Sequence, residues 1–332
     1  MNQHLPTVAI FTTGGTIASR IDPATGAAGA VEAPEDLIQT VPGIDRLANF
    51  ELHPVAMVPS WNMTPELMWQ LAQQIETTLQ RPEITAAVVT HGTDSVEETA
   101  YLVSLVNSAT KPVVFVVAMR NLSETGADGP RNLSDAIRTA IDPASSARGV
   151  LLVVNQTIHD ARFVTKTDTV NPHTFESPDF GPAGIIDGFA VRYLHAPARA
   201  RHLPANRLER RVEIVKAVTG SDGAHIEWLV SRGTRGIVLE GSGAGNVPVT
   251  MLPAINDALA RGVTVVLTSR CLSGFLSPIY GGASGAGGGF DLTAAGVIPA
   301  QHLPSQKARI KLMVALGSGL EDHALRELFA FP

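Results

Sequence analysis

The chain has 332 residues, 45% of them apolar and only 5% aromatic, and a formal net charge of −6. This length exceeds what one hydrophobic core usually supports, so two domains are expected. Charges of both signs are mixed along the chain and no basic run reaches five residues, which argues against a nucleic-acid or membrane-surface partner. Cys271 is the single cysteine, which excludes an intrachain disulfide and a thiolate metal cluster.

The sequence predicts neither a membrane-spanning helix nor a signal peptide. No apolar run reaches about 18 residues, so no membrane-spanning helix is predicted. The N-terminus, Met1–His4, leads almost directly into a strand-like run and lacks the charged start and apolar core of a signal peptide. A cytoplasmic protein is therefore the simplest expectation.

Strand-like and helical segments alternate through the first half of the chain. Strands are predicted at Thr7–Thr12, Phe50–Val58, Ala86–Thr90, Pro112–Met119 and Gly149–Asn155. Helices are predicted at Pro34–Val41, Thr64–Gln80 with Thr64 as the N-cap, Asp94–Ser108 and Asn132–Ile141. The segment Asp22–Glu32 is rich in glycine and alanine and is expected to be a loop. This order predicts a mostly parallel sheet with helices on both faces.

The composition of the chain changes near its middle. Residues 192–211 contain six arginines and little apolar periodicity, which indicates an interdomain linker. Strands are predicted beyond it at Arg211–Val218, Gly236–Glu240 and Val263–Thr268, and helices at His225–Arg232, Pro248–Arg261, Ser305–Leu316 and Asp322–Phe329. Gly281–Gly289 holds six glycines in nine residues and is expected to be a loop.

The predicted fold class is therefore α/β, with two α/β domains. Residues 1–191 form a larger N-terminal catalytic domain with a mostly parallel sheet flanked by helices. Residues 192–211 form the linker, and residues 212–332 form a smaller C-terminal α/β domain.

Hydroxyl- and glycine-rich residues follow two of the predicted strands, at Thr12–Thr16 and His91–Asp94. Ligands of open α/β sheets bind beyond the carboxyl ends of the strands, where both runs lie. A threonine hydroxyl beside inward-turned backbone N–H groups can attack a carbonyl while those groups hold the developing oxyanion. Each run alone is also typical of a strand-to-loop turn, with Thr93 or Asp94 as the N-cap of the following helix.

A nucleophilic hydroxyl needs a base, and a lysine whose charge is disfavoured by burial can supply one. The chain has five lysines, and Lys166 is the best candidate because it lies in the apolar-polar run Phe163–Thr167. The alternative is a surface lysine on a hairpin, and the periodicity alone favours that alternative.

The two threonine motifs, Thr13–Ala18 and Thr90–Asp94, resemble the signature motifs of bacterial-type L-asparaginases. Further segments resemble that family in order and spacing: Glu97–Tyr101, Ala118–Arg120, Ala127–Leu133, Val164–Thr167 and Lys307–Arg309. The resemblance implies hydrolysis of a side-chain amide, that of L-asparagine or a close analogue, to a carboxylate and ammonia. It also implies a homotetramer built as a dimer of dimers, with no metal and no organic cofactor.

The resemblance assigns roles to individual residues. Thr16 matches the first nucleophilic threonine of the family, and Thr93 matches a second one in a triad with Lys166 and Asp94. Ser60 matches a residue that binds the substrate α-carboxylate, and Asp94 would also hold the α-ammonium group. The expected substrate contacts are Gly15, Ser60, Trp61, Gly92, Thr93 and Asp94.

The chain departs from the family pattern in three places. The family normally has a tyrosine in the loop after the first motif, but residues 17–50 contain none. Many members supply a glutamate from a neighbouring subunit, but no glutamate lies between Glu240 and Glu321. Trp61 follows Ser60 where a polar residue is usual.

These departures leave alternatives open. Thr16 could attack with Lys166, Thr93 and water carrying its proton, Thr93 could itself attack, or Tyr280 could restore a phenol from another direction. The chain could instead be a weakened amino-acid-binding protein or an amidase for another amide. Gly241–Gly245 follows a predicted strand, the context of a phosphate-binding loop, and leaves nucleotide binding as a further alternative.

Overall fold

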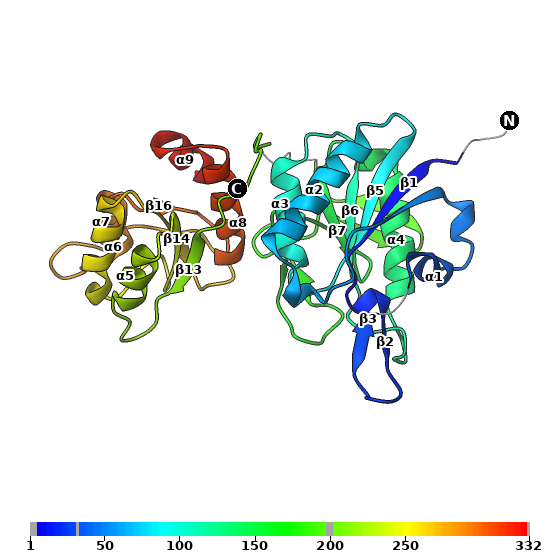
Figure 1. Ribbon diagram of the computed structural model, residues 1–332, viewed down its shortest axis with the longest axis horizontal. Coiled ribbons are helices and arrows are strands. Elements are labelled where there is room, and N and C mark those ends of the chain that lie inside the picture. The colour runs from blue at the N-terminus through cyan, green and yellow to red at the C-terminus, as the bar shows by residue number, and fades with distance from the viewer. Residues whose placement is uncertain (1–4, 31–32, 197–201, 331–332) are drawn as a thin grey trace. The chain divides into compact units, whose positions relative to one another are not determined.

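The computed structural model describes residues 5–30, 33–196 and 202–330. Two compact units divide the chain, Met1–His202 and Leu203–Pro332, and each has its own sheet (Figure 1). The predicted α/β class is confirmed. Parts of three predicted segments, Met1–His4, residues 31–32 of the expected loop and residues 197–201 of the expected linker, lie outside the described residues.

The N-terminal unit is organised around an eight-stranded sheet in the order β12-β11-β8-β7-β6-β5-β1-β4. Its strands are β1 (Thr7–Thr12), β4 (Asn49–Pro54), β5 (Ile84–Thr90), β6 (Val113–Val116), β7 (Val150–Val154), β8 (Thr157–Asp160), β11 (Gly184–Asp187) and β12 (Ala190–Tyr193). Neighbours from β4 to β7 are parallel, and β8, β11 and β12 extend the sheet with antiparallel pairs. The sheet is therefore mostly parallel, with an antiparallel edge.

The central strands are apolar on both faces because helices cover both. Helices α1 (Pro34–Gln39) and α4 (Gly129–Ile141) bury Leu37 and Leu133 against one face, which includes Val8 and Val88. Helices α2 (Pro65–Leu79) and α3 (Val96–Val106) pack together and contact β1, β5 and β7. Buried parallel strands of this kind read as continuous apolar runs, which explains why they could be predicted from sequence.

Two small hairpins stand outside this sheet. The segment expected to be a loop, Asp22–Glu32, contains part of an antiparallel hairpin formed by β2 (Ser19–Ile21) and β3 (Ala28–Ala30), which projects from the N-terminal unit in Figure 1. A second hairpin joins β9 (Thr165–Lys166) to β10 (Phe175–Glu176).

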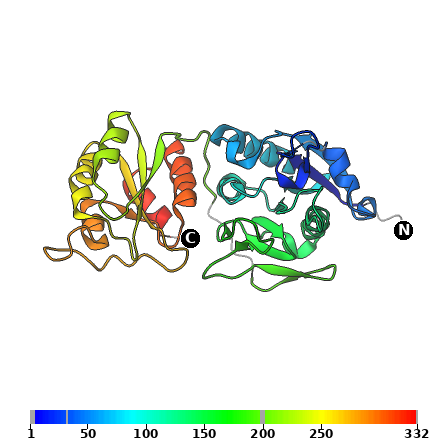
Figure 2. The ribbon, with the colours of Figure 1, turned by 90° about the horizontal axis from the view of Figure 1, so that it is seen from below.

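The C-terminal unit contains a four-stranded parallel sheet in the order β13-β14-β15-β16. Its strands are β13 (Val212–Lys216), β14 (Gly236–Gly241), β15 (Thr264–Ser269) and β16 (Ile298–Pro299). Its helices are α5 (Ala224–Ser231), α6 (Leu252–Ala260), α7 (Gly289–Ala295), α8 (Ser305–Gly317) and α9 (Asp322–Phe329). Figure 2 shows these strands between two helical layers.

Several predicted boundaries differ from the structure for local reasons. The strand predicted at Phe50–Val58 ends at Pro54, because the next two N–H groups both turn onto the Thr12 carbonyl at 3.0 and 3.2 Å. The strand predicted at Pro112–Met119 is shorter, covering Val113–Val116. The glycine-rich loop gives way to α7 at Gly289. β12 ends at Tyr193, beyond the predicted start of the linker at residue 192. No helix in the described ranges is long and apolar enough to span a membrane.

Candidate active site

The two threonine-rich runs lie side by side because β1 and β5 are neighbours in the sheet. Thr12 pairs with Thr90 at the carboxyl ends of these parallel strands. Beyond that pair, the Thr90 carbonyl accepts bonds from the N–H and the Oγ1 hydroxyl of Thr13, at 3.2 and 3.0 Å. The sheet register therefore continues into the two motifs and aligns them.

Glycine is required where the two motifs meet. Gly15 has φ +90° and ψ 178°, a conformation that suits glycine, and a Cβ placed on it would lie 2.4 Å from the Cα of Gly92. A Cβ placed on Gly92 would lie 2.6 Å from the Oγ of Ser60. The backbones thus approach each other at distances that no larger residue allows.

Ser60 connects the second motif to a neighbouring turn, residues Ser60–Asn62. Its hydroxyl oxygen accepts a bond from the Asp94 N–H at 3.1 Å, and its carbonyl accepts one from the Ser95 hydroxyl at 2.6 Å. Because the Ser60 hydroxyl acts as an acceptor toward Asp94, its own hydrogen remains available for a ligand.

Lys166 reaches the second motif from the β9–β10 hairpin. Its Nζ lies 3.0 Å from the Oγ1 of Thr93 and 2.7 Å from Oδ1 of Asp94. The side chain is 17% exposed, whereas that of Asp94 is 46% exposed. Lys166 therefore does lie on a hairpin, but its ammonium is directed to a threonine and a carboxylate.

A cavity of about 200 Å³ adjoins these groups. It is lined by Gly15, Thr16, Ser19, Ala28, Gly29, Pro59, Ser60, Trp61, Gly92, Thr93, Asp94 and Asn121. The lining therefore includes every residue that was predicted from the sequence as a substrate contact, and it also includes Thr16. Lys166 is not part of the described lining, but it contacts two lining residues, Thr93 and Asp94.

Five lining residues were not predicted. Ala28 and Gly29 come from the β2–β3 hairpin, and Ser19 begins that hairpin with its hydroxyl bonded to the Gly15 carbonyl at 2.8 Å. Pro59 directly precedes Ser60. Asn121 directly follows Ala118–Arg120, a segment that resembles the family, and this adjacency was the one signal in the sequence.

Thr93 and Asp94 do not cap the helix that follows them. Helix α3 starts at Val96 with Ser95 at the N-cap position, and no side chain bonds that cap. The alternative that these residues serve as helix caps is therefore wrong, and their side chains contact Lys166 instead.

His91 is buried beneath the second motif. Its Nδ1 lies 2.8 Å from the Gly92 carbonyl, which can only accept, so Nδ1 carries the hydrogen. Complete burial lowers the pKa of His91 to about 4. The imidazole is therefore neutral at physiological pH, and the described cavity lining does not include it.

None of the three tyrosines is among the described lining residues of this cavity. Tyr101 is buried, and the Tyr193 hydroxyl bonds Ser145. Tyr280 belongs to the C-terminal unit, where its side chain is 57% exposed.

The glycine run at Gly241–Gly245 has a packing role. Ser242 and Asn246 form a tight bridge, and a Cβ on Gly245 would lie 3.0 Å from Leu267 and from Leu276. Close packing against apolar side chains thus requires glycine there without any bound phosphate.

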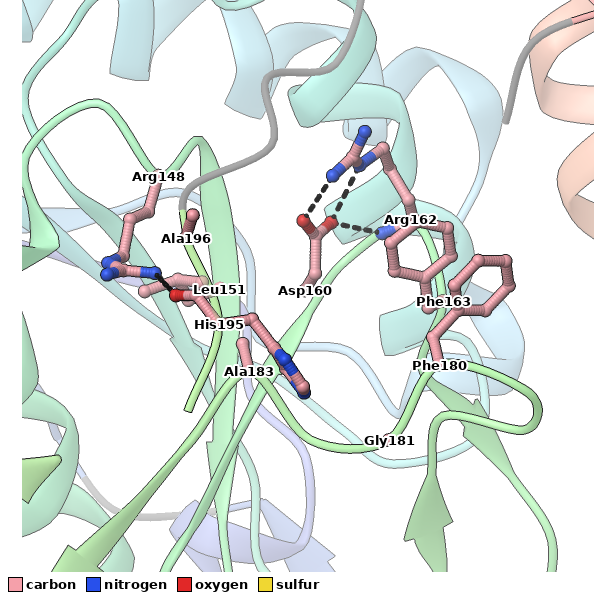
Figure 3. A pocket seen from close by; sticks show the side chains of 10 residues that line it. All are labelled: Arg148, Leu151, Asp160, Arg162, Phe163, Phe180, Gly181, Ala183, His195 and Ala196. Atoms are coloured by element: carbon pink, nitrogen blue, oxygen red, sulfur yellow. Dashed lines mark hydrogen bonds and ion pairs between the residues drawn. The ribbon is translucent and has the colours of Figure 1, made fainter. Parts of the chain in front are cut away.

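A second cavity, of about 350 Å³, lies elsewhere in the N-terminal unit (Figure 3). Asp160 accepts two bonds from the Arg162 guanidinium at 3.0 and 2.7 Å, and the rings of Phe163 and Phe180 stack at 3.8 Å between centroids. Arg148 donates to the His195 carbonyl at 2.8 Å. Its charged groups thus bind one another or the backbone, and the predicted site residues are absent from its described lining.

Within the described ranges, no cluster of three or more His, Cys, Asp or Glu side chains could hold a metal ion.

Comparison with known proteins identifies the family. Residues 7–199 match the family model "Asparaginase, N-terminal", and residues 211–329 match "Glutaminase/Asparaginase C-terminal domain". The chain is 37% identical to an L-asparaginase of Bacillus licheniformis, over 95% of this chain and 98% of that protein. It is 40% identical to a probable L-asparaginase of Deinococcus radiodurans, over 99% of this chain and 98% of that protein.

A solved structure agrees over the same extent. The crystal structure of a probable cytoplasmic L-asparaginase from Campylobacter jejuni superimposes with a TM-score of 0.87, at 33% identity, covering 98% of this chain and 99% of the other. The resemblance found in the sequence is confirmed: the chain belongs to the asparaginase family.

Proposed function

We propose that this protein hydrolyses the side-chain amide of L-asparagine, or of a close analogue, to a carboxylate and ammonia with a threonine nucleophile. The observation that carries this proposal is the contact of Lys166 Nζ with both Thr93 Oγ1 and Asp94 Oδ1, at 3.0 and 2.7 Å, beside a cavity that Thr16 also lines.

The contact supplies a route for the proton. In its neutral form, the Lys166 amine can accept the Thr93 hydroxyl proton while the Asp94 carboxylate accepts one of the amine hydrogens. The freed alkoxide attacks the amide carbon, the C–N bond breaks with transfer of that proton to the leaving nitrogen, and ammonia departs. Water then hydrolyses the acyl ester and restores the threonine.

Thr16 is the second candidate nucleophile. Its hydroxyl has no hydrogen bond among the described residues, but hydrogen bonds of catalytic groups often tighten only when the substrate is bound. In that arrangement, Thr93 and Lys166 would relay the proton of Thr16.

The substrate end that does not react also has partners. Asp94 can pair with an ammonium group, and the free hydrogen of the Ser60 hydroxyl can bond a carboxylate oxygen. Asparagine, which is named in the relatives above, carries both groups on one carbon. Shape and charge together favour an α-amino acid amide over a simple amide.

Exposed apolar side chains in the C-terminal unit support self-association as a dimer of dimers. They include Leu272, Phe275, Ile279, Tyr280 and Phe290, each more than half exposed. Light scattering on the purified protein should give the mass of a tetramer, and a monomer at micromolar concentration would contradict this assembly. The name of the Campylobacter relative supports a cytoplasmic location for this protein as well.

Ammonia release tests the activity. We expect turnover of L-asparagine within a panel that also holds D-asparagine, L-glutamine and simple amides. Thr16→Ala, Thr93→Ala and Lys166→Met should each lower kcat by roughly a thousandfold or more. When several groups act as one catalytic unit, the loss of any one member removes most of the rate enhancement of the whole unit.

The alternative of a binding protein has its own signature. Calorimetric titration with L-aspartate and ammonia assays on the same preparation separate the two. Micromolar binding without ammonia release from any member of the panel would favour the binding protein and reject the proposed hydrolysis.

A further inference from the structure

Trp61 presents an apolar surface at the candidate active site. The side chain is 72% exposed and also lines the cavity. In the described part of the chain, no aromatic ring or cation stacks on its indole. An exposed indole that borders a ligand cavity is an apolar contact without a partner in the free protein.

The segment that carries the Trp61 indole is held in place by hydrogen bonds. Trp61 lies in the short turn Ser60–Asn62, where the Ser60 carbonyl accepts bonds from the Ser95 hydroxyl at 2.6 Å and from the Met63 N–H at 3.1 Å. Pro59 fixes the backbone on the other side of Ser60. Trp61 is thus a preformed surface beside Ser60 and Asp94, the groups expected to hold the α-carbon substituents of the substrate.

The charges of the cavity decide which substituent can extend toward the indole. The described lining contains one charged side chain, Asp94, and no lysine, arginine or histidine. A free α-ammonium therefore gains an ion pair with Asp94 beside the existing contact with Lys166, and blocking the ammonium would remove that additional ion pair. The α-carboxylate has only hydrogen-bond donors, which also suit the carbonyl oxygen of a peptide bond.

We propose that the site accepts asparagine as the N-terminal residue of a short peptide, with an aromatic second residue stacked on Trp61. This inference rests on the proposed hydrolysis and extends its substrate class. The reaction is the same: water replaces the side-chain nitrogen, ammonia leaves, the asparaginyl residue becomes aspartyl, and the peptide bond stays intact.

The test compares ammonia release from L-asparagine, Asn-Gly and Asn-Phe, with mass spectrometry confirming an intact aspartyl dipeptide. We expect kcat/KM for Asn-Phe to exceed that for Asn-Gly by roughly threefold to tenfold, the range that one aromatic pair supplies. Trp61→Ala should abolish this preference, and Trp61→Phe should retain most of it.

Trp228 provides the matched control, because it is 57% exposed on α5 of the C-terminal unit and lies outside the described lining of the cavity. Trp228→Ala should leave the Asn-Phe preference unchanged.

Turnover of L-asparagine without turnover of Asn-Phe would overturn the inference and leave the proposed function standing. So would an equal preference in the wild-type and Trp61→Ala proteins. Failure of all three amides would also overturn the inference, and failure of the whole amide panel described above would reject the proposed function.

Discussion

The Nζ of Lys166 lies 3.0 Å from the Oγ1 of Thr93, a residue 73 positions earlier in the chain. The contact depends on two local structures: the end of β5, which places Thr93, and the β9–β10 hairpin, which carries Lys166. Asp94 completes the group, and its exposed carboxylate leaves the ion pair accessible to a ligand.

The identity of the nucleophile can be measured by trapping the acyl-enzyme. Acid quenching during turnover of L-asparagine, followed by peptide mass spectrometry, should find an aspartyl ester on a threonine of the site. The contact with Lys166 predicts Thr93. Acylation of Thr16 would assign Thr93 and Lys166 to a proton relay, and acylation of neither residue would contradict threonine catalysis. Lys166→Met should show no burst of ester.

The close contact between Gly15 and Gly92 predicts that one methyl group added at Gly15 strongly lowers the stability of the fold. Gly15→Ala places a Cβ in a glycine-only conformation and against the Gly92 backbone, so it should lower the free energy of unfolding by about 1–3 kcal/mol. Urea denaturation checks this. Gly29→Ala is the control, because a Cβ there meets no atom within 4 Å, and its effect should stay within about 0.5 kcal/mol. Equal effects of the two substitutions would contradict the packing account.

Burial of His91 predicts that stability depends on pH. The folded protein holds the pKa of His91 at about 4, whereas an exposed histidine ionises near 6.5. Between these values the unfolded chain binds the additional proton. The contribution of His91 is therefore fully present above about pH 6.5 and is lost as the pH falls toward 4, at a cost of about 3 kcal/mol.

A variant isolates this contribution from that of the carboxylates. His91→Asn keeps a donor for the Gly92 carbonyl and removes the titration, so its unfolding free energy should fall less than that of the wild type between pH 7 and pH 4.5. Parallel pH curves for the two proteins would show that His91 is not the group responsible.

Local signals in the sequence explain why much of the fold was predictable. Strand β1 coincides with its predicted range, Thr7–Thr12, because its residues are buried on both faces and form one apolar run. Helix α2 begins where the Thr64 hydroxyl accepts the Leu67 N–H at 3.3 Å, as the N-cap pattern indicated. These elements are determined by neighbours in the chain.

The unpredicted elements depend on distant contacts. β9 is only two residues long, and its pairing with Phe175 has no periodic signal. The pattern around Lys166 therefore favoured a surface lysine on a hairpin and gave no sign of its contacts with Thr93 and Asp94. The contribution of Ala28 and Gly29 to the cavity lining could not be predicted either, because small residues in a glycine-rich segment predict a loop. The position of Lys166 and the lining role of Ala28 and Gly29 both depend on contacts with residues that are distant in the chain.

The central claim is that the Lys166 contact drives amide hydrolysis, and ammonia release from L-asparagine by Lys166→Met tests it most directly. Lys216→Met is the control, because Lys216 also pairs with a carboxylate, that of Glu240 at 2.8 Å, in the C-terminal unit. The account predicts roughly a thousandfold or greater loss of kcat for Lys166→Met and near-normal turnover for Lys216→Met. Near-normal turnover by Lys166→Met would contradict it.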